Sequence, residues 1–213
     1  MDLKHILLRY FLPMTICFFG LSLLNLIPSI QKTYYPIFEK YTLSIATAGQ
    51  PDMYFKSRPG GETDPNNYNK ITVLHNTKKH LQAIIDRSRA TGRQGQYDYK
   101  GFIVTIDEHF ITPLIFFFSL LLVTPGNWKR KLINFLIGSV LIMGFAYLTI
   151  HFKSLHMVAT SGVLGVVDAN TLKGYKLISY LFSSITTITV VLIVWILLAF
   201  RKSDFKNFLV GAE

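Results

Sequence analysis

Five residues of types that take part in catalysis or metal binding lie at the ends of two apolar stretches. Asp107, Glu108 and His109 lie immediately before the second apolar stretch of the chain, and His151 and His156 lie at or just after the end of the third. If these stretches form neighbouring helices, the five side chains share one layer at a membrane surface. Imidazole and carboxylate groups together could bind zinc, perform acid–base catalysis or relay protons, and His109 with His151 could ligate a haem iron. An ordinary polar layer at helix ends suits the same residues, so we assign no catalytic residue and expect no cofactor.

A basic helix is the second candidate. From Asn76 the pattern becomes helical, because Leu81, Ile84 and Ile85 recur on one face and Gly92 supplies a stop signal. The other face could bind anionic lipid headgroups, a phosphorylated lipid, an acidic polysaccharide or another partner, and a merely solvated face suits the same residues. Its basic residues are Lys78, Lys79, Arg87 and Arg89, joined by Arg93.

Two histidines, His75 and His80, flank the start of this helix. Five positions on a helix place two side chains about 140° apart, which suits a shared metal ion poorly. We therefore expect both imidazoles to face solvent.

Four long apolar stretches must position these candidates. They cover roughly residues 10–30, 110–126, 132–151 and 177–200. Each is close to the ~20 residues that a helix needs to cross a bilayer. Only 16% of the 213 residues are charged, against about 25% in soluble domains. The pattern predicts an α-helical membrane protein with four transmembrane helices, and the lack of charged residues or histidine deep inside them argues against a pump or transporter.

The polar passage between the first and second stretches predicts a small α+β domain. Strand patterns occur at 41–48, 53–55, 71–74 and 101–106, with the basic helix between the last two. The expected organisation is a transmembrane helix at 1–30, an extracytoplasmic domain at 31–109, and three transmembrane helices with a short cytoplasmic tail at 110–213. The apolar run 157–167 is too short to span and suggests an interfacial or re-entrant segment.

The formal net charge of +10 is concentrated at the ends of the apolar stretches. Basic residues at such ends mark the cytoplasmic side of a membrane protein, and both basic and aromatic residues anchor it at the interface. We therefore place both termini and the turn near Trp128 in the cytoplasm, with 31–109 outside an inner (plasma) membrane, and we expect no nucleic-acid binding. The predicted anchors are Arg9, Trp128, Lys129, Arg130, Lys131, Arg201 and Lys202.

A family resemblance covers residues 112–138. It consists of the apolar run 112–119, the proline-containing basic turn 124–132 and Gly138. These features resemble membrane segments of bacterial exosortase/archaeosortase-type envelope proteins. The enzymes of that family use a Cys, an Arg and a His at the outer membrane face, whereas the single cysteine here, Cys17, lies within the first apolar stretch. The resemblance therefore implies an accessory protein and not the sorting enzyme.

Together these observations predict a non-enzymatic inner-membrane accessory or scaffold subunit of an envelope assembly or export system. Its partners, other membrane or envelope proteins, would bind the 31–109 domain. Two alternatives stay open. One is a membrane-surface enzyme or a redox or metal-binding subunit that uses Asp107, Glu108, His109, His151 and His156. The other is a lipid or glycan sensor that uses the basic helix.

Overall fold

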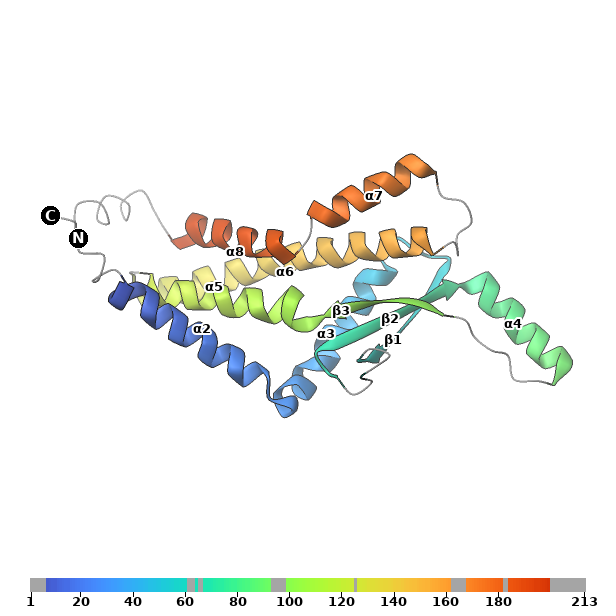
Figure 1. Ribbon diagram of the computed structural model, residues 1–213, viewed down its shortest axis with the longest axis horizontal. Helices are drawn as coiled ribbons and strands as arrows, with labels where there is room; N and C mark the ends of the chain where they lie inside the picture. The colour runs from blue at the N-terminus through green and yellow to red at the C-terminus, as the bar shows by residue number, and fades with distance from the viewer. Residues whose placement is uncertain are drawn as a thin grey trace. The chain divides into compact units, whose positions relative to one another are not determined.

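A computed structural model describes residues 7–60, 64, 67–92, 99–124, 126–161, 168–181 and 184–199 (Figure 1). The chain is mostly helical with one small sheet. Its elements are η1 (Leu7–Phe11), α2 (Leu12–Asn25), α3 (Pro28–Thr47), β1 (Met53–Pro59), β2 (Lys70–Thr77), α4 (Lys78–Thr91), β3 (Lys100–Thr105), η2 (Asp107–Ile111), α5 (Thr112–Val123), α6 (Trp128–Thr160), α7 (Ala169–Leu181) and α8 (Ser184–Ala199).

These elements form two compact units. Unit 1 comprises the described residues within Met1–Gln31, Asp107–Ala146 and Ser184–Glu213. Unit 2 comprises those within Lys32–Ile106 and Tyr147–Ser183. The helix α6 thus contributes its first part to unit 1 and its last part to unit 2.

The helix α5 is the core of unit 1. It contacts α2 on one side and α8 on another, as Figure 1 shows. Phe117, Leu120 and Leu121 of α5 are buried in one cluster with Ile142 of α6 and Val191 of α8. A helix that is apolar all round must be surrounded by other apolar surface, and α5 has the highest share of buried residues in this bundle because it has neighbours on several sides.

Two described helical segments are long and apolar enough to cross a membrane. They are Leu8–Asn25 and Trp128–Thr160, and only 6% of the first and 28% of the most apolar window of the second are buried inside the protein. The predicted second span corresponds to η2 and α5, and the predicted fourth span is divided between α7 and α8, which is 16 residues long. The four-span prediction is therefore not confirmed. Residues 157–160 of the predicted interfacial or re-entrant segment continue α6, and residues 162–167 lie outside the described part, so the location of this segment stays a prediction.

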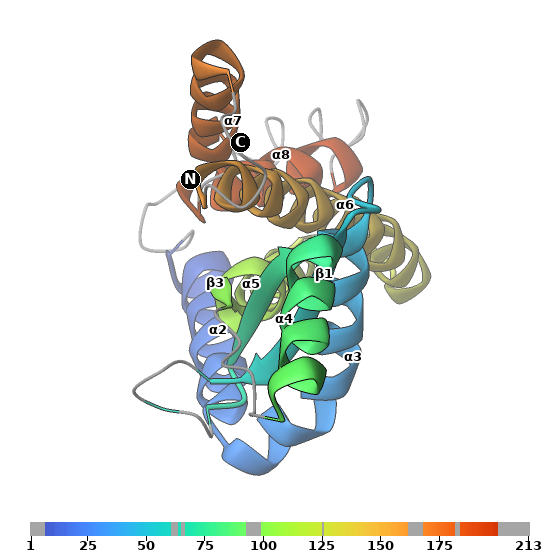
Figure 2. The same ribbon diagram turned by 90° about the vertical axis from the view of Figure 1, so that its right-hand side faces the viewer.

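Unit 2 is built on a three-stranded antiparallel sheet with the order β1-β2-β3. Figure 2 shows α3 beside this sheet. Alternate residues of the strands point to one face, where Phe55, Ile71, Val73, Phe102 and Val104 are all buried. The strands predicted near 53–55, 71–74 and 101–106 are thereby confirmed.

The predicted strand at 41–48 is wrong, because residues 41–47 belong to α3 and Ala48 follows in a turn. Pro28 begins that helix, at a position where its missing N–H does little harm. The buried residues Thr42, Ile45 and Ala46 are spaced three and four apart, which is the helical period. The alternation of small polar and apolar residues in this segment suits either structure, and only packing against the rest of unit 2 distinguishes them.

Gly138 allows the helices α5 and α6 to approach each other closely in unit 1. A Cβ atom on Gly138 would collide with the ring of Phe117 on α5, whereas one on Gly144 would meet no atom within 4 Å among the described residues. We expect Gly138→Ala to lower the stability of the bundle by about 1–3 kcal/mol through overpacking. Gly144→Ala is the matched control, and it should be neutral or slightly stabilising because Ala favours helices.

Thermal unfolding of both variants in a neutral detergent measures the difference. Equal melting temperatures for Gly138→Ala and Gly144→Ala would show that α5 and α6 do not pack in this way.

Candidate functional site

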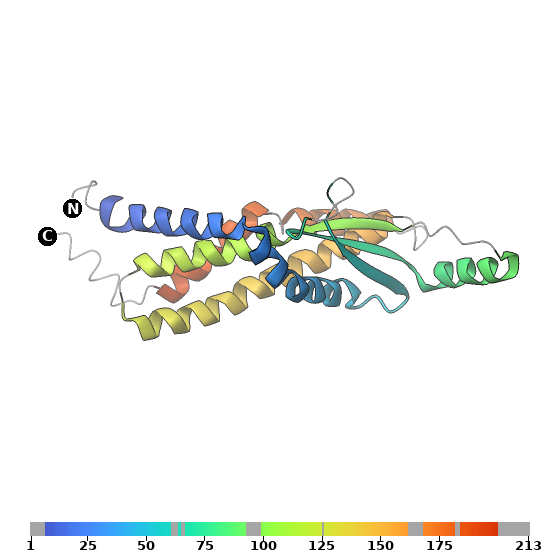
Figure 3. The ribbon, with the colours of Figure 1, turned by 90° about the horizontal axis from the view of Figure 1, so that it is seen from below.

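The basic helix α4 extends from the sheet of unit 2 (Figure 3). Thr77 caps its start by accepting a hydrogen bond from the His80 amide at 3.1 Å, and Gly92 ends it with a left-handed φ of 63°. Leu81 is its buried contact, while Ile84 and Ile85 remain half-buried. The helix is therefore attached near its first turns, and most of its length is available for contacts.

The predicted basic residues lie on the exposed side of α4. Lys78, Lys79, Arg87 and Arg89 are all exposed, and Arg93 lies outside the described residues. The acidic residue of the helix, Asp86, accepts a hydrogen bond from Gln82 at 3.0 Å. The first turn contains no acidic residue, although the helix dipole favours anions there and disfavours Lys78 and Lys79. These lysines do not serve helix stability, and their position suits the binding of an anionic group.

The predicted acidic and histidine candidates of unit 1 lie in and around η2. Asp107 accepts a hydrogen bond from the side chain of Asn25, and the Asn25 carbonyl accepts one from the Gln31 amide at 3.1 Å. Glu108 is exposed, whereas His109 is buried at 5% exposure. The Asp107 carboxylate thus joins the start of η2 to the end of α2, which is a structural role.

The other two candidates, His151 and His156, belong to unit 2. The ring of His151 stacks on Tyr147 with 5.9 Å between centroids, and His156 is half-buried on the same helix. No unit contains all five predicted residues. Across the described ranges, no three His, Cys, Asp or Glu side chains are grouped so that they could hold a metal ion.

The prediction that His75 faces solvent is wrong, whereas His80 is exposed as expected. The strand β2 continues to Thr77, so His75 alternates inward with Ile71 and Val73. Its ring lies between Phe55 and Phe102, with centroids 6.2 and 6.4 Å away. Neither ring nitrogen has a hydrogen-bond partner among the described residues. Burial, with a smaller contribution from Lys100, lowers the pKa of His75 below its ordinary value.

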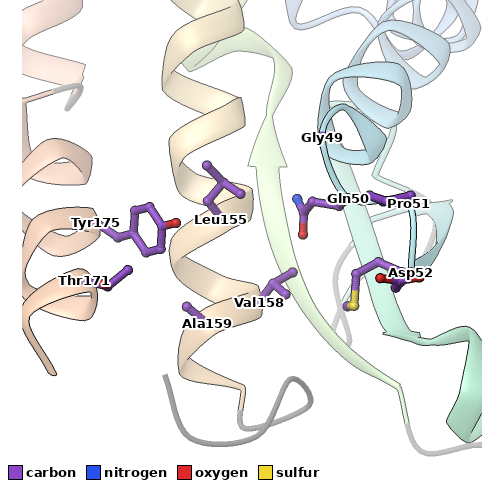
Figure 4. Close-up of a pocket in the computed structure, with 10 residues that line it drawn as sticks. Gly49, Gln50, Pro51, Asp52, Leu155, Val158, Ala159, Thr171 and Tyr175 are labelled. Atoms are coloured by element: carbon purple, nitrogen blue, oxygen red, sulfur yellow. The ribbon is translucent and has the colours of Figure 1, made fainter. Parts of the chain in front are cut away.

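A cleft of about 310 Å³ opens within unit 2 between the α3–β1 connection, the end of α6 and α7 (Figure 4). Leu155, Val158 and Ala159 form its apolar floor, and Tyr175 faces them from α7. Gln50 lies at the edge, where its amide donates hydrogen bonds to Ala46 O at 3.0 Å and Ser154 Oγ at 3.1 Å. The cleft is mostly apolar, and its polar amide is already occupied by these bonds.

The predicted basic anchors of unit 1 also make specific hydrogen bonds. Lys131 Nζ donates to Leu122 O at 2.6 Å at the end of α5, and Arg130 donates to Ala199 O at 3.0 Å at the end of α8. Asn134 donates to Leu198 O at 2.8 Å. Trp128, Lys129 and Arg9 are exposed, and Arg201 and Lys202 lie outside the described residues. The start of α6 therefore caps the C-termini of two other helices.

The sequence interpretation missed Asn25 and Asn134. Each is an amide within or at the end of an apolar stretch, and an amide in such a stretch usually has a hydrogen-bond partner. That rule indicates that a partner exists, but it does not identify Asp107 or the Leu198 carbonyl.

Comparisons of this chain with protein-family models, with curated proteins and with solved structures found no match.

The buried His75 makes stability depend on pH. Because its pKa is lower in the folded chain than in the unfolded chain, the unfolded state binds the proton first as the pH falls. We expect the free energy of unfolding to be unaffected by this group above about pH 6.5, its ordinary pKa, and to decrease below that pH. His75→Leu should remove this pH dependence. It should also raise the free energy of unfolding by about 1 kcal/mol at neutral pH, since a buried imidazole without partners is replaced by an apolar side chain.

Denaturant unfolding followed by circular dichroism at pH 7.5 and 5.0 tests this expectation, with the exposed His80→Gln as control. The same loss of stability at pH 5.0 in the wild type and in His75→Leu would contradict it.

Proposed function

We propose that this chain is a membrane-anchored accessory or scaffold subunit without catalytic activity of its own. In this proposal unit 1 lies in the bilayer, and unit 2 binds an acidic partner protein through α4. The observation on which the proposal rests is the geometry of α4, an amphipathic basic helix attached near its first turns and exposed along most of its length.

A membrane location is supported by the exposed apolar surface of unit 1. A core helix of a soluble protein is mostly buried. In contrast, only 6% of the residues of Leu8–Asn25 and 28% of the most apolar 18 residues of Trp128–Thr160 are buried. Large exposed apolar side chains also cover α8, including Ile188 at 52% and Leu197 at 72% exposure. Contiguous apolar surface of this kind requires a lipid or protein environment.

We propose four membrane crossings, formed by η1 with α2, η2 with α5, α6, and α8. The helix α8 has 16 residues and would measure about 24 Å, somewhat less than the ~30 Å hydrocarbon thickness. Local thinning of the bilayer can accommodate a short helix at modest cost. Both termini and the basic turn at Trp128 would be cytoplasmic, and residues 31–109 would face the opposite side of an inner membrane.

The shape and charge of α4 support an interaction with a partner. Four exposed basic side chains and one acidic residue give the helix a positive face, and Ile84 and Ile85 add a half-buried apolar stripe beside it. A stripe with flanking charges is the pattern by which a helix docks into a groove of another protein. The resemblance of residues 112–138 to exosortase/archaeosortase-type segments leads us to propose an envelope assembly or export system as the setting.

An anionic lipid or glycan would suit the same basic face and is the second candidate. For an enzyme or metal-binding subunit, the described residues offer less support, because Asp107 is engaged with Asn25.

Co-purification from native membranes in a mild detergent tests the proposal. We expect the full-length chain to retain a membrane partner, and Lys78→Ala, Lys79→Ala, Arg87→Ala and Arg89→Ala together to reduce the retained partner at least about tenfold, since charge-assisted bonds are lost. A matched control removes four other exposed basic residues of unit 2: Lys56, Arg58, Lys173 and Lys176.

The control variant should retain the partner. An isolated monomer in the wild-type preparation, or equal loss in the two variants, would refute the scaffold proposal. Loss of binding to anionic vesicles without loss of a protein partner would favour the lipid-sensor candidate.

A further inference from the structure

A second cleft lies in unit 1, at the end where the basic residues cap the helices. Its volume is about 370 Å³, and it is lined by Arg9 and Pro13 at the start of the chain, by Leu122, Val123 and Thr124 at the end of α5, and by Lys131 of α6. All of these residues belong to one unit. Its lining contains no residue of α4 and none of the cleft in unit 2.

The positive charge of this cleft suits the binding of an anion. Arg9 and Lys131 both line it, and none of its described lining residues is acidic. Lys131 uses one N–H on Leu122 O at 2.6 Å, and an ammonium group has three donors. The guanidinium of Arg9 lies 5.7 Å from the centroid of the Tyr10 ring, an arrangement that orients it and leaves its planar donors available for a tetrahedral oxyanion.

Part of the remaining wall of the cleft is apolar, and Tyr10 and Thr124 add hydroxyl groups to it. Pro13, Leu122 and Val123 lie beside the two cations, and the apolar stretches of α2 and α5 begin or end at the same place. A cleft with a cationic part and an apolar part, at the end of membrane-crossing helices, suits a charged headgroup joined to an apolar stem.

We propose that this cleft binds a phosphate group, with Arg9 and Lys131 as its ligands. The phosphate is that of an anionic phospholipid or of a small phosphate anion. The lipid form of the proposal rests on the membrane location of unit 1, but it does not depend on α4 or on a protein partner.

The two tryptophans of the chain are natural reporters for this site. Trp195 Nε1 donates a hydrogen bond to Thr124 Oγ1 at 2.9 Å, and Thr124 lines the cleft. The ring of Trp128 lies 5.4 Å from Lys131 Nζ. A brominated lipid bound in the cleft would therefore quench tryptophan fluorescence.

The test compares brominated phosphatidic acid with brominated phosphatidylcholine, added to the full-length chain in a neutral maltoside detergent. We expect phosphatidic acid to quench at a markedly lower mole fraction in the wild type. Arg9→Gln should require about tenfold more phosphatidic acid, as expected for the loss of a charge-assisted contact. Lys129→Gln is the matched control, because Lys129 is exposed on the same turn and does not line the cleft.

A second arm adds inorganic phosphate to the lipid-bound protein. Recovery of fluorescence at millimolar phosphate would support the site with a small anion as ligand, and no recovery would support it with a lipid as ligand. Arg9→Gln leaves the Lys131–Leu122 bond intact, and its circular dichroism spectrum confirms that it is folded. Replacement of the four basic residues of α4 should leave quenching unchanged, which separates this proposal from the partner-binding proposal.

Equal quenching by the two lipids would overturn the proposal. So would wild-type quenching in Arg9→Gln, or an equal loss in Lys129→Gln, because the latter would indicate attraction by net charge alone.

Discussion

Unit 1 depends on the hydrogen bonds by which the first turns of α6 satisfy the C-termini of α5 and α8. The last carbonyls of a helix have no partner within that helix, and a buried carbonyl without a hydrogen-bond partner is costly. Lys131 and Arg130 donate to Leu122 O and Ala199 O, and Asn134 donates to Leu198 O. Because the same segment of α6 caps both helices, it holds the C-terminal ends of α5 and α8 against the start of α6. The same constraint holds Lys131 at the edge of the proposed phosphate cleft.

Local signals in the sequence predicted much of the fold. Turn and cap residues, together with hydrophobic periodicity, located β1, β2, β3 and α4, and Gly92 ends α4 as expected. The segment 41–48 was predicted as a strand because its alternation suits two structures, and burial of Thr42 and Ile45 against unit 2 makes it helical. His75 was predicted to face solvent because the strand was expected to end at residue 74, whereas β2 continues to Thr77. In both cases tertiary packing decided what a short pattern could not.

The sequence indicated which residues form the candidate sites, but not which contacts most of them make. The basic turn was predicted to be a membrane anchor from composition, but its capping bonds require the positions of α5 and α8. Asp107 was recognised as a polar residue before an apolar stretch, but its bond to Asn25 joins residues 82 positions apart. The basic face of α4 was predicted in full for its described residues, since it follows from helical periodicity alone. Two basic surfaces result, one on each unit, and they suit different anionic ligands.

The central claim is that unit 1 lies in the bilayer with its basic turn in the cytoplasm, while α4 is presented on the other side. The most direct measurement places single cysteines in a Cys17→Ser chain, at Ala90 on α4 and at Lys129 on the basic turn, both exposed. A membrane-impermeant maleimide is then applied to cells with an accessible outer face of the inner membrane, before and after permeabilisation. The account predicts that the cysteine at position 90 reacts before permeabilisation and the cysteine at position 129 only afterwards. Reaction of both cysteines from the same side would contradict it.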